Sequence, residues 1–214
     1  MDELQFLETL YTPLVSDTMD KLGISGQVFD HSIQQIFSDA NQKIAGYAFP
    51  CRVIPTEEYV EIDTLLQMVD SIRTDSFVAV AADADIDAAL WGGMMSARAK
   101  ARGARGAVVN GGVRDLEQIT ALDFPVFGSY RCIKDIRKRG YMAAFDTTIT
   151  IGGVTVAPND IIFADANGVL AISQVHKERI IEALVENRLN EELTMKGLQE
   201  GSAAKALFER YKTF

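Results

Sequence analysis

The segment ALWGGMMSARAKARGARGAVVNGGVRDLE, residues 89–117, decides the fold of this chain. Its residues 94–102 combine alanine with long unbranched side chains and contain no β-branched residue, which favours a helix. Residues 106–109 form a short apolar run that is typical of a buried strand. The NGG sequence at residues 110–112 predicts a loop able to adopt positive φ, and the next helix should begin at Asp115. The segment therefore predicts an α/β fold.

Two loops of this segment are expected to lie side by side. The first contains Gly92 and Gly93, and it follows an apolar run at residues 77–82 that we interpret as a strand. If this strand and the one before the second loop are parallel neighbours, both loops leave the sheet at the same edge, because the carboxyl ends of parallel strands lie together. The first loop would then share one cleft with Arg114 and Asp115.

The composition restricts the kind of protein. The chain of 214 residues has no internal repeat and no linker long enough to mark a second domain, so we interpret residues 1–214 as a single domain. No apolar run approaches the roughly 20 residues of a membrane span, and the first residues lack the basic start of a signal peptide, so we expect a cytoplasmic protein without membrane contact. The formal net charge of −9 argues against non-specific binding to nucleic acid. Because the chain has only two histidines, any metal should be bound by oxygen ligands.

The rest of the chain predicts further strands and C-terminal helices. The sequence FPVF at residues 124–127 predicts a third short strand. Residues 147–157 predict a hairpin, since two alternating apolar runs flank a pair of glycines. Two more strands follow at IIFA and VLAIS, and residues 176–196 predict a long amphipathic helix.

Two charged segments have alternative interpretations. The ADADID sequence at residues 82–87 is interpreted as a solvated acidic loop, with a calcium loop as the alternative, although the closing glutamate of an EF-hand is missing. Residues 131–139 hold five basic residues and one acid, Asp135. We interpret this basic run as a solvated face, and contact with an anion or RNA is the alternative.

Arg114 and Asp115 also allow two interpretations. Asp115 with Gln118 three positions later fits a capping box, which stabilises the start of a helix by about 1 kcal/mol, and Arg114 could be an ordinary surface ion-pair partner. Alternatively, Arg114 offers a planar pair of donors to a carboxylate or enolate oxygen, while Asp115 offers an oxygen to a hard divalent cation. A single carboxylate is a common protein contribution to a magnesium site, because water and substrate fill the other positions.

The start of the first helix could bind an anion. Backbone amides at the beginning of a helix lack partners within the helix and point outward, so the amides of Gly92, Gly93, Met94 and Met95 could bind a negatively charged group. Two adjacent glycines would let a ligand approach this backbone closely. A tight turn without any ligand is the simpler interpretation of the same glycines.

Several segments of the chain resemble a known family. The sequence WGGMMSARAKARGARGAVVNGGVRD is similar to the diagnostic segment of the RraA-like family, which includes the class II 4-hydroxy-4-methyl-2-oxoglutarate aldolases. The family's marker is a loop residue, twenty intervening positions and then Arg-Asp, and Gly93 with Arg114 and Asp115 keeps this spacing. The similarity extends to FPVF at residues 124–127, to TIGGVTVAPNDIIFADANGVLAI at residues 150–172 and to TPLVSDTMDKLG near the N-terminus.

The resemblance implies a fold, an assembly and a cofactor. The fold would be a swivelling β/β/α domain with C-terminal helices, assembled as a homotrimer or a dimer of trimers. The cofactor would be a divalent cation, Mg²⁺ or Mn²⁺, and the substrate a small 2-oxo acid of the pyruvate or oxaloacetate type. If the roles known in the family are transferred to the matching residues, the carboxylate of the pyruvyl group would bind to the backbone of Gly92, Gly93, Met94 and Met95.

The resemblance also implies roles for individual side chains. Arg114 would bind the keto oxygen of the substrate and Asp115 would bind the metal, so both would be catalytic. Aldolase members often have an acid where this chain has Gly93, and this departure leaves the aldol substrate and the general base open. Family members also use a glutamate from the C-terminal region of a neighbouring subunit, for which Glu191 and Glu192 are candidates.

The resemblance therefore implies a lyase that works through a metal-stabilised enolate. It would cleave 2-oxo acids of the 4-hydroxy-4-methyl-2-oxoglutarate type to pyruvate and would decarboxylate oxaloacetate. No lysine Schiff base is needed, and neither cleft loop offers a lysine. The alternative is a non-catalytic regulator, since some members of the family restrain ribonuclease E by contact, and the basic run could supply such contacts. Retention of Asp115 favours the enzyme, because a protein that only binds has no need of a metal ligand.

Overall fold

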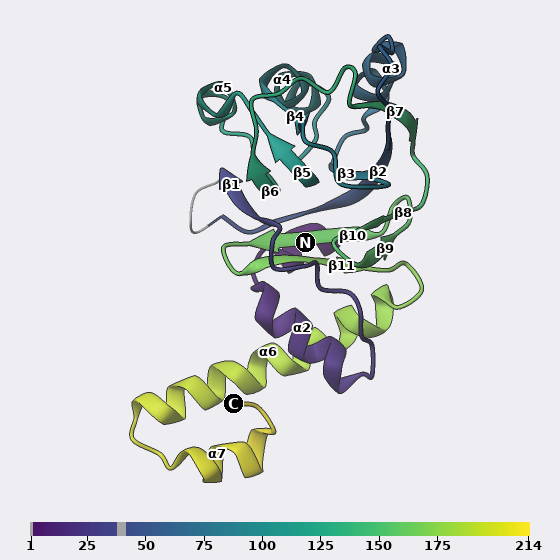
Figure 1. The fold of residues 1–214 in the computed structure, drawn as a ribbon. Coiled ribbons are helices and arrows are strands. Elements are labelled where there is room, and N and C mark those ends of the chain that lie inside the picture. Colours follow the sequence, from purple (N-terminus) through teal and green to yellow (C-terminus); the bar gives the residue numbers. More distant parts are fainter. Residues whose placement is uncertain (1, 38–41) are drawn as a thin grey trace.

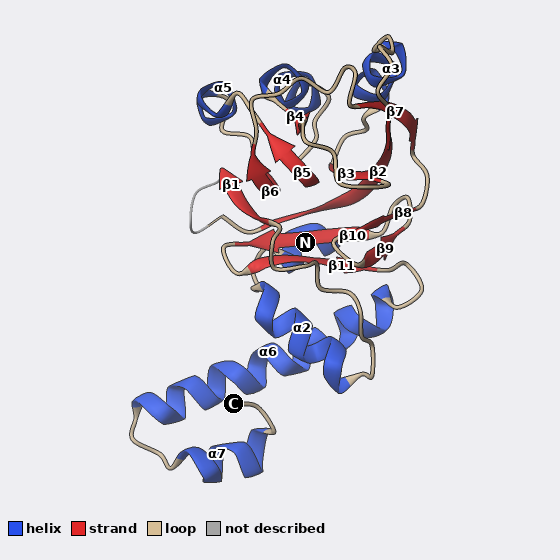
Figure 2. Ribbon diagram, in the orientation of Figure 1, coloured by secondary structure: helices blue, strands red, loops and turns tan. Residues whose placement is uncertain are grey.

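A computed structural model of the chain describes residues 2–37 and 42–214, and it contains a nine-stranded mixed sheet, a separate hairpin and helices on both sides (Figures 1 and 2). The strands are β1 (Gln34–Phe37), β2 (Ile44–Pro55), β3 (Ser76–Ala82), β4 (Ala89–Trp91), β5 (Gly106–Val113), β6 (Val126–Arg131), β7 (Gly140–Phe145), β8 (Ile149–Ile151), β9 (Val154–Val156), β10 (Ile161–Asp165) and β11 (Gly168–Ile172). The helices are α1 (Glu3–Leu7), α2 (Thr12–Lys21), α3 (Asp63–Ser71), α4 (Gly93–Ala101), α5 (Leu116–Ala121), α6 (Lys177–Gln199) and α7 (Ala204–Tyr211). The α/β class with C-terminal helices is therefore confirmed.

The strands at the centre of the sheet are parallel. The order is β1-β6-β5-β3-β2-β10-β11, with β4 paired to β5 and β7 paired to β2. Strands β2, β3, β5 and β6 run parallel, whereas β1, β7, β10 and β11 pair antiparallel to their neighbours. The predicted parallel pairing of β3 with β5 is confirmed, with Phe77 opposite Gly106 and Val80 opposite Val109.

Apolar side chains cover both faces of these central strands, which is why their sequences are continuous apolar runs rather than alternating ones. On one face, Val78 and Val80 of β3 pack against α3, α4 and α5, which lie together over the sheet in Figure 1. On the other face, Phe77 and Ala79 pack against the β8–β9 hairpin, whose prediction is confirmed. A third cluster joins α1, α2 and α6 to β10 and β11.

The prediction of a loop at residues 110–112 is wrong, because β5 continues through these residues to Val113. Neither Gly111 nor Gly112 has a positive φ. These glycines are needed for close packing instead: a Cβ on Gly111 would lie 2.6 Å from the Leu90 side chain, and one on Gly112 would lie 2.6 Å from the Cys132 Cβ. Leu90 belongs to strand β4, which pairs with β5 and is too short to recognise in the sequence, and Cys132 directly follows β6. The positive φ falls on Asp115.

The C-terminal helices extend away from the sheet (Figure 1). Helix α6 buries Ile180 and Leu184, but Val185 and Leu189 on its predicted apolar side are 59% and 55% exposed. Helix α7 packs back on α6 after the turn at Gly201. In the part of the chain that the structure describes, no helix combines the length and apolar character needed to cross a bilayer.

Candidate functional site

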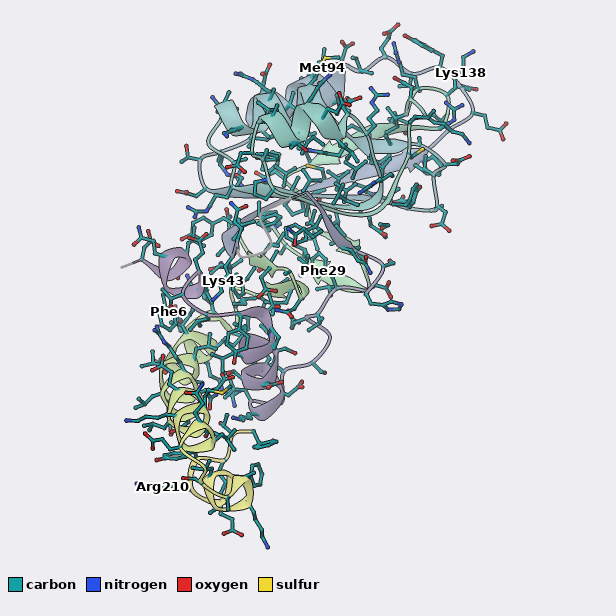
Figure 3. All side chains as sticks on the ribbon, turned by 90° about the vertical axis from the view of Figure 1, so that its left-hand side faces the viewer. Phe6, Phe29, Lys43, Met94, Lys138 and Arg210 are labelled. Carbon is teal, nitrogen blue, oxygen red and sulfur yellow. The ribbon has the colours of Figure 1, made fainter. Side chains whose placement is uncertain are left out.

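The candidate site is a pocket of about 450 Å³ between α3, the first turn of α4 and the segment that follows β5. Five of the six predicted site residues line it, namely Gly92, Met94, Met95, Arg114 and Asp115. The sixth, Gly93, lies behind them and is connected to Asp115 by a hydrogen bond. In Figure 3, Met94 lies at the end of the molecule opposite to Arg210 of α7, so the pocket is remote from the C-terminal helices of the same chain. The predicted convergence of the two chain segments on one cleft is confirmed.

Asp115 connects the two segments. Its Oδ2 accepts a hydrogen bond from the backbone N–H of Gly93 at 3.1 Å and lies 3.5 Å from Nε of Arg114. The capping-box interpretation is wrong, because the Asp115 side chain makes no cap hydrogen bond to α5. The physical reason is the left-handed backbone of Asp115, with φ 59°, which turns the carboxylate away from α5 and toward the start of α4.

Arg114 is positioned by a second carboxylate that the sequence analysis did not assign to the site. Nη1 of Arg114 lies 3.4 Å from Oδ2 of Asp135, and the backbone N–H of Arg114 donates to the Trp91 carbonyl oxygen. A hydrogen bond from Arg137, aided by the charge of Arg114, lowers the pKa of Asp135 to about 2. The only sequence signal for Asp135 was its position as the single acid in the basic run.

The loop before α4 is held by buried side chains. Nε1 of Trp91 donates to the Ser96 hydroxyl at 2.8 Å, and this hydroxyl lies 3.1 Å from the Gly92 carbonyl oxygen. Gly92 has an extended backbone, but a Cβ there would lie 2.7 Å from Oδ2 of Asp115. A side chain at this position would therefore displace the carboxylate.

The first turn of α4 offers two backbone amides to a ligand. The Gly93 amide is occupied by Asp115, while those of Met94 and Met95 belong to the group that an α-helix leaves without an intrahelical partner. Both methionines line the pocket, at the start of the helix. An anionic group of a ligand could bind there, next to the Arg114 guanidinium.

Asp115 fits a divalent cation held mainly by water and substrate. Within residues 2–37 and 42–214, no three His, Cys, Asp or Glu side chains gather in the arrangement that a protein-only metal site needs. Asp115 contributes one oxygen to Gly93, and its other oxygen, Oδ1, has no hydrogen bond from a described group. Proteins commonly bind magnesium through only one or two carboxylates, while water and other ligands fill the remaining positions. The available oxygen of Asp115 beside the pocket fits this pattern.

The two charged segments form ion pairs with each other and with their neighbours. Lys134 pairs with Asp87, and Arg137 pairs with Asp135 at 3.0 Å. Arg52 pairs with Asp83 at 2.6 Å through two hydrogen bonds. Two of the five basic residues of the run are therefore paired with carboxylates, which agrees with a solvated face. The described part of the acidic loop gathers no calcium ligands.

Glu191 and Glu192 lie in a different part of the chain from this pocket. They line a second hollow between α6 and residues 9–14, where burial raises the pKa of Glu191. Glu192 pairs with Arg188 at 2.9 Å. Neither glutamate can therefore complete the Arg114 site of its own chain.

Comparison with known proteins shows the family of the chain. The family model RraA-like, described as Aldolase/RraA, matches residues 12–171. Protein DlpA of Legionella pneumophila is 31% identical over 97% of this chain, which spans 33% of the length of DlpA. A protein of Halalkalibacterium halodurans with the provisional name 4-hydroxy-4-methyl-2-oxoglutarate aldolase is 26% identical over 95% of this chain and 92% of its own.

A solved structure shows the same fold. Streptomyces coelicolor RraAS2, described as an unusual member of the RNase ES inhibitor RraA protein family, has a TM-score of 0.80 to this chain. The similarity covers 91% of this chain and 97% of that one at 19% identity, so it supports the fold alone. The family match, the fold and the geometry around Gly93, Arg114 and Asp115 agree, and the chain belongs to the RraA-like family, Aldolase/RraA.

Proposed function

We propose that this chain is a divalent-metal-dependent lyase that forms pyruvate from small 2-oxo acids. Its reactions would be aldol cleavage of compounds of the 4-hydroxy-4-methyl-2-oxoglutarate type and decarboxylation of oxaloacetate. The observation that carries this proposal is the placement of Arg114, Asp115 and the first turn of α4 around one pocket. The names of relatives such as the Halalkalibacterium halodurans protein agree with an aldolase.

The residues of the chain would bind the pyruvyl end of the substrate. The amides of Met94 and Met95 would receive its carboxylate, and the Arg114 guanidinium would donate to its keto oxygen. Asp115 would hold a divalent cation, Mg²⁺ or Mn²⁺, which as a Lewis acid would draw electron density from the keto group. Gly92 would leave room for the ligand beside the Asp115 carboxylate.

Arg114 would act when the bond between C3 and C4 breaks. The electron pair of that bond moves toward C2, negative charge builds up on the former keto oxygen, and the donors of Arg114 stabilise this charge. In the aldol cleavage, the C4 hydroxyl loses its proton as its oxygen becomes a carbonyl. In the decarboxylation, C4 leaves as carbon dioxide. C3 then takes up a proton, which gives pyruvate in both reactions.

The two reactions differ in whether they require a general base. Aldol cleavage requires a base for the C4 hydroxyl, and Asp135 is unsuited to this role because its pKa of about 2 makes it a weak base at neutral pH. Decarboxylation requires no such base. We therefore expect decarboxylation of oxaloacetate to be the more robust activity and the better first assay.

The test is pyruvate release from oxaloacetate and from a panel of 4-hydroxy-2-oxo acids, measured with Mg²⁺, with Mn²⁺ and with a chelator. We expect pyruvate formation that is lost with the chelator and restored by either metal. Absence of any metal-dependent pyruvate release would overturn the proposal and would favour the non-catalytic regulator of ribonuclease E. The basic run gives that second function limited support, since two of its five cations, Lys134 and Arg137, are already paired with carboxylates.

A further inference from the structure

We propose that the pocket beside Arg114 and Asp115 prefers 2-oxo acids that carry a hydrocarbon group at C4 over those that carry a carboxylate there. This inference rests on the proposed formation of pyruvate and ranks its substrates. Compounds with a carboxylate at C4, such as 4-hydroxy-4-methyl-2-oxoglutarate and oxaloacetate, would bind more weakly than 2-oxo acids with only hydrocarbon there. Cleavage of such a 4-hydroxy-2-oxo acid would break the bond between C3 and C4. The hydroxyl proton would leave as C4 becomes a carbonyl, C3 would take up a proton, and the products would be pyruvate and an apolar aldehyde or ketone.

The pocket has a polar end and an apolar end. The polar end holds Arg114, Asp115 and the amides of α4, which together suit the pyruvyl group. The apolar end is a wall of aliphatic and thioether side chains from α3 and the first turn of α4: Ile62, Leu65, Leu66, Val69, Met94 and Met95. We call this set the apolar wall.

The apolar wall is accessible from the pocket mainly at Leu66 and Met94, whereas Val69 belongs to the core and Leu65 and Met95 pack against it. Met68 and Ile72 of α3 are fully buried in the core, whereas Leu66 is 48% exposed. Met94 is 81% exposed at the start of α4. A hydrocarbon group bound there would cover accessible apolar area and would be stabilised by leaving water.

The cations that line the apolar end are already occupied. Nε of Arg98 donates to Asp70 at 2.7 Å, and Arg137 holds both oxygens of Asp135 at 3.0 and 3.2 Å. Arg114 is different, because its contacts with carboxylates are longer, at 3.4 and 3.5 Å, and its donors serve the polar end.

A second carboxylate on the substrate would therefore find no unpaired cation among the described residues at the apolar end. It would have to share a guanidinium with Asp70 or Asp135, and it would then lie close to that aspartate. Both effects disfavour a negatively charged group, because a desolvated charge needs a partner and like charges repel.

The size of the pocket agrees with an additional apolar group. Its volume of about 450 Å³ lies within the range of roughly 300 to 1,000 Å³ that is usual for small-molecule pockets. A pyruvyl group bound at Arg114 would leave space beside α3, where the lining residues are mostly apolar and include the Asp70–Arg98 ion pair.

Binding can be measured without turnover, using two probes that lack the C4 hydroxyl. One is 4-methyl-2-oxopentanoate, which ends in a branched hydrocarbon, and the other is 2-oxoglutarate, which ends in a carboxylate. Trp91 is the single tryptophan of the chain and lines the pocket, so its fluorescence reports binding of either probe in the presence of Mg²⁺. We expect the hydrocarbon probe to bind at least about 10-fold more tightly, the usual scale for apolar pocket contacts.

Two variants test the physical cause. Leu66→Gln makes the wall polar at an accessible position and should weaken binding of 4-methyl-2-oxopentanoate by about 10-fold. Val175→Gln, at a more exposed apolar position outside the pocket, is the control and should leave both affinities unchanged. Asp70→Asn removes the partner of Arg98 and should strengthen binding of 2-oxoglutarate, because a cation at the apolar end is released.

Equal or tighter binding of 2-oxoglutarate by the native chain would overturn the inference. So would an Asp70→Asn variant in which 2-oxoglutarate binds no better than before. These outcomes are separate from a failure of the proposed function, which would appear as absence of pyruvate release from every substrate. In that case the titrations with the two probes would still decide whether the pocket prefers a hydrocarbon.

Discussion

Oδ2 of Asp115 accepts a hydrogen bond at 3.1 Å from the backbone N–H of Gly93, and this contact joins the two chain segments that form the site. It fixes the carboxylate at the start of α4 rather than at the start of α5, its own neighbour in sequence. The side chain is thereby placed in the pocket, where it can bind a ligand, instead of serving as a helix cap.

Gly92→Ala should disrupt this arrangement without unfolding the chain. The added Cβ would lie 2.7 Å from Oδ2 of Asp115 and 3.1 Å from Cγ of Arg114, so both side chains must shift. Displacements of this kind cost about 100-fold in catalytic efficiency. The extended backbone of Gly92 accepts alanine, so the melting temperature should not fall.

Oxaloacetate decarboxylation and thermal unfolding of the Gly92→Ala variant check this expectation. Ala97→Ser, an exposed change on the same helix, is the control and should keep full activity. A fully active Gly92→Ala protein would show that the placement of Asp115 and Arg114 does not limit catalysis.

Asp135 should make the stability of the chain dependent on acidic pH. Its pKa is lowered from the ordinary value of 3.8 to about 2 by the hydrogen bond from Arg137 and the nearby charge of Arg114. A carboxyl whose pKa is lower in the folded state stabilises the fold above its unfolded pKa. This stabilisation is lost as the pH falls from about 4 to about 2.

The stability difference between the native chain and Asp135→Asn should therefore be present at pH 7 and should shrink through that acidic range. Urea unfolding at several pH values measures it. Asp85→Asn is the control, because Asp85 forms no ion pair in the described part of the chain. A difference that stays constant down to pH 2 would contradict the ion-pair explanation.

Assembly should be required for activity. Helix α6 leaves Val185, Leu189 and Leu193 exposed by 59%, 55% and 37%, which is an extended apolar surface for one helix. We expect this surface to be covered by another copy of the chain, as a homotrimer or a dimer of trimers, with Glu191 or Glu192 delivered to a neighbouring pocket. Leu189→Glu should then lower both the molar mass in light scattering and the activity. A native monomer with full activity at assay concentration would rule this out.

The sequence predicted the centre of the sheet because the order strand, loop and helix restricts the topology. The parallel pairing of β3 with β5 follows from that order, but Gly93 lies beside Arg114 because the unpredicted strand β4 pairs with the end of β5. Local sequence patterns were less reliable where the backbone conformation determines which hydrogen bonds a side chain can make. Asp115 and Gln118 have the spacing of a capping box, yet the left-handed φ of Asp115 prevents it.

Other parts of the site could not be predicted because they depend on tertiary contacts. Asp135 reaches Arg114 from a different segment, and its sequence surroundings suggested only a basic surface. Strand β4 has three residues and no periodicity to recognise. Helix α3 is amphipathic in sequence, but nothing in that sequence shows that Leu66 faces a pocket instead of solvent.

Substitutions of Arg114 and of Asp115 should impair activity in different ways. Asp115→Asn keeps the shape and the tolerance for a left-handed backbone but loses the charge that would hold the cation. Because Asp115 does not cap α5, the melting temperature should change little while metal-dependent decarboxylation collapses. Arg114→Lys keeps the charge but loses the planar pair of donors, so turnover should fall by about 100- to 1,000-fold and binding of the keto acid should weaken.

Melting temperature, metal affinity and oxaloacetate decarboxylation measured on both variants separate these expectations. Asp115→Asn should raise the metal concentration needed for activity, whereas Arg114→Lys should leave that concentration unchanged and lower the rate at saturating metal. The contrast follows from geometry, since Oδ1 of Asp115 is available to a cation while the Arg114 guanidinium offers only donors. Full metal-dependent activity in Asp115→Asn would place the metal elsewhere and would overturn the roles proposed for this pair.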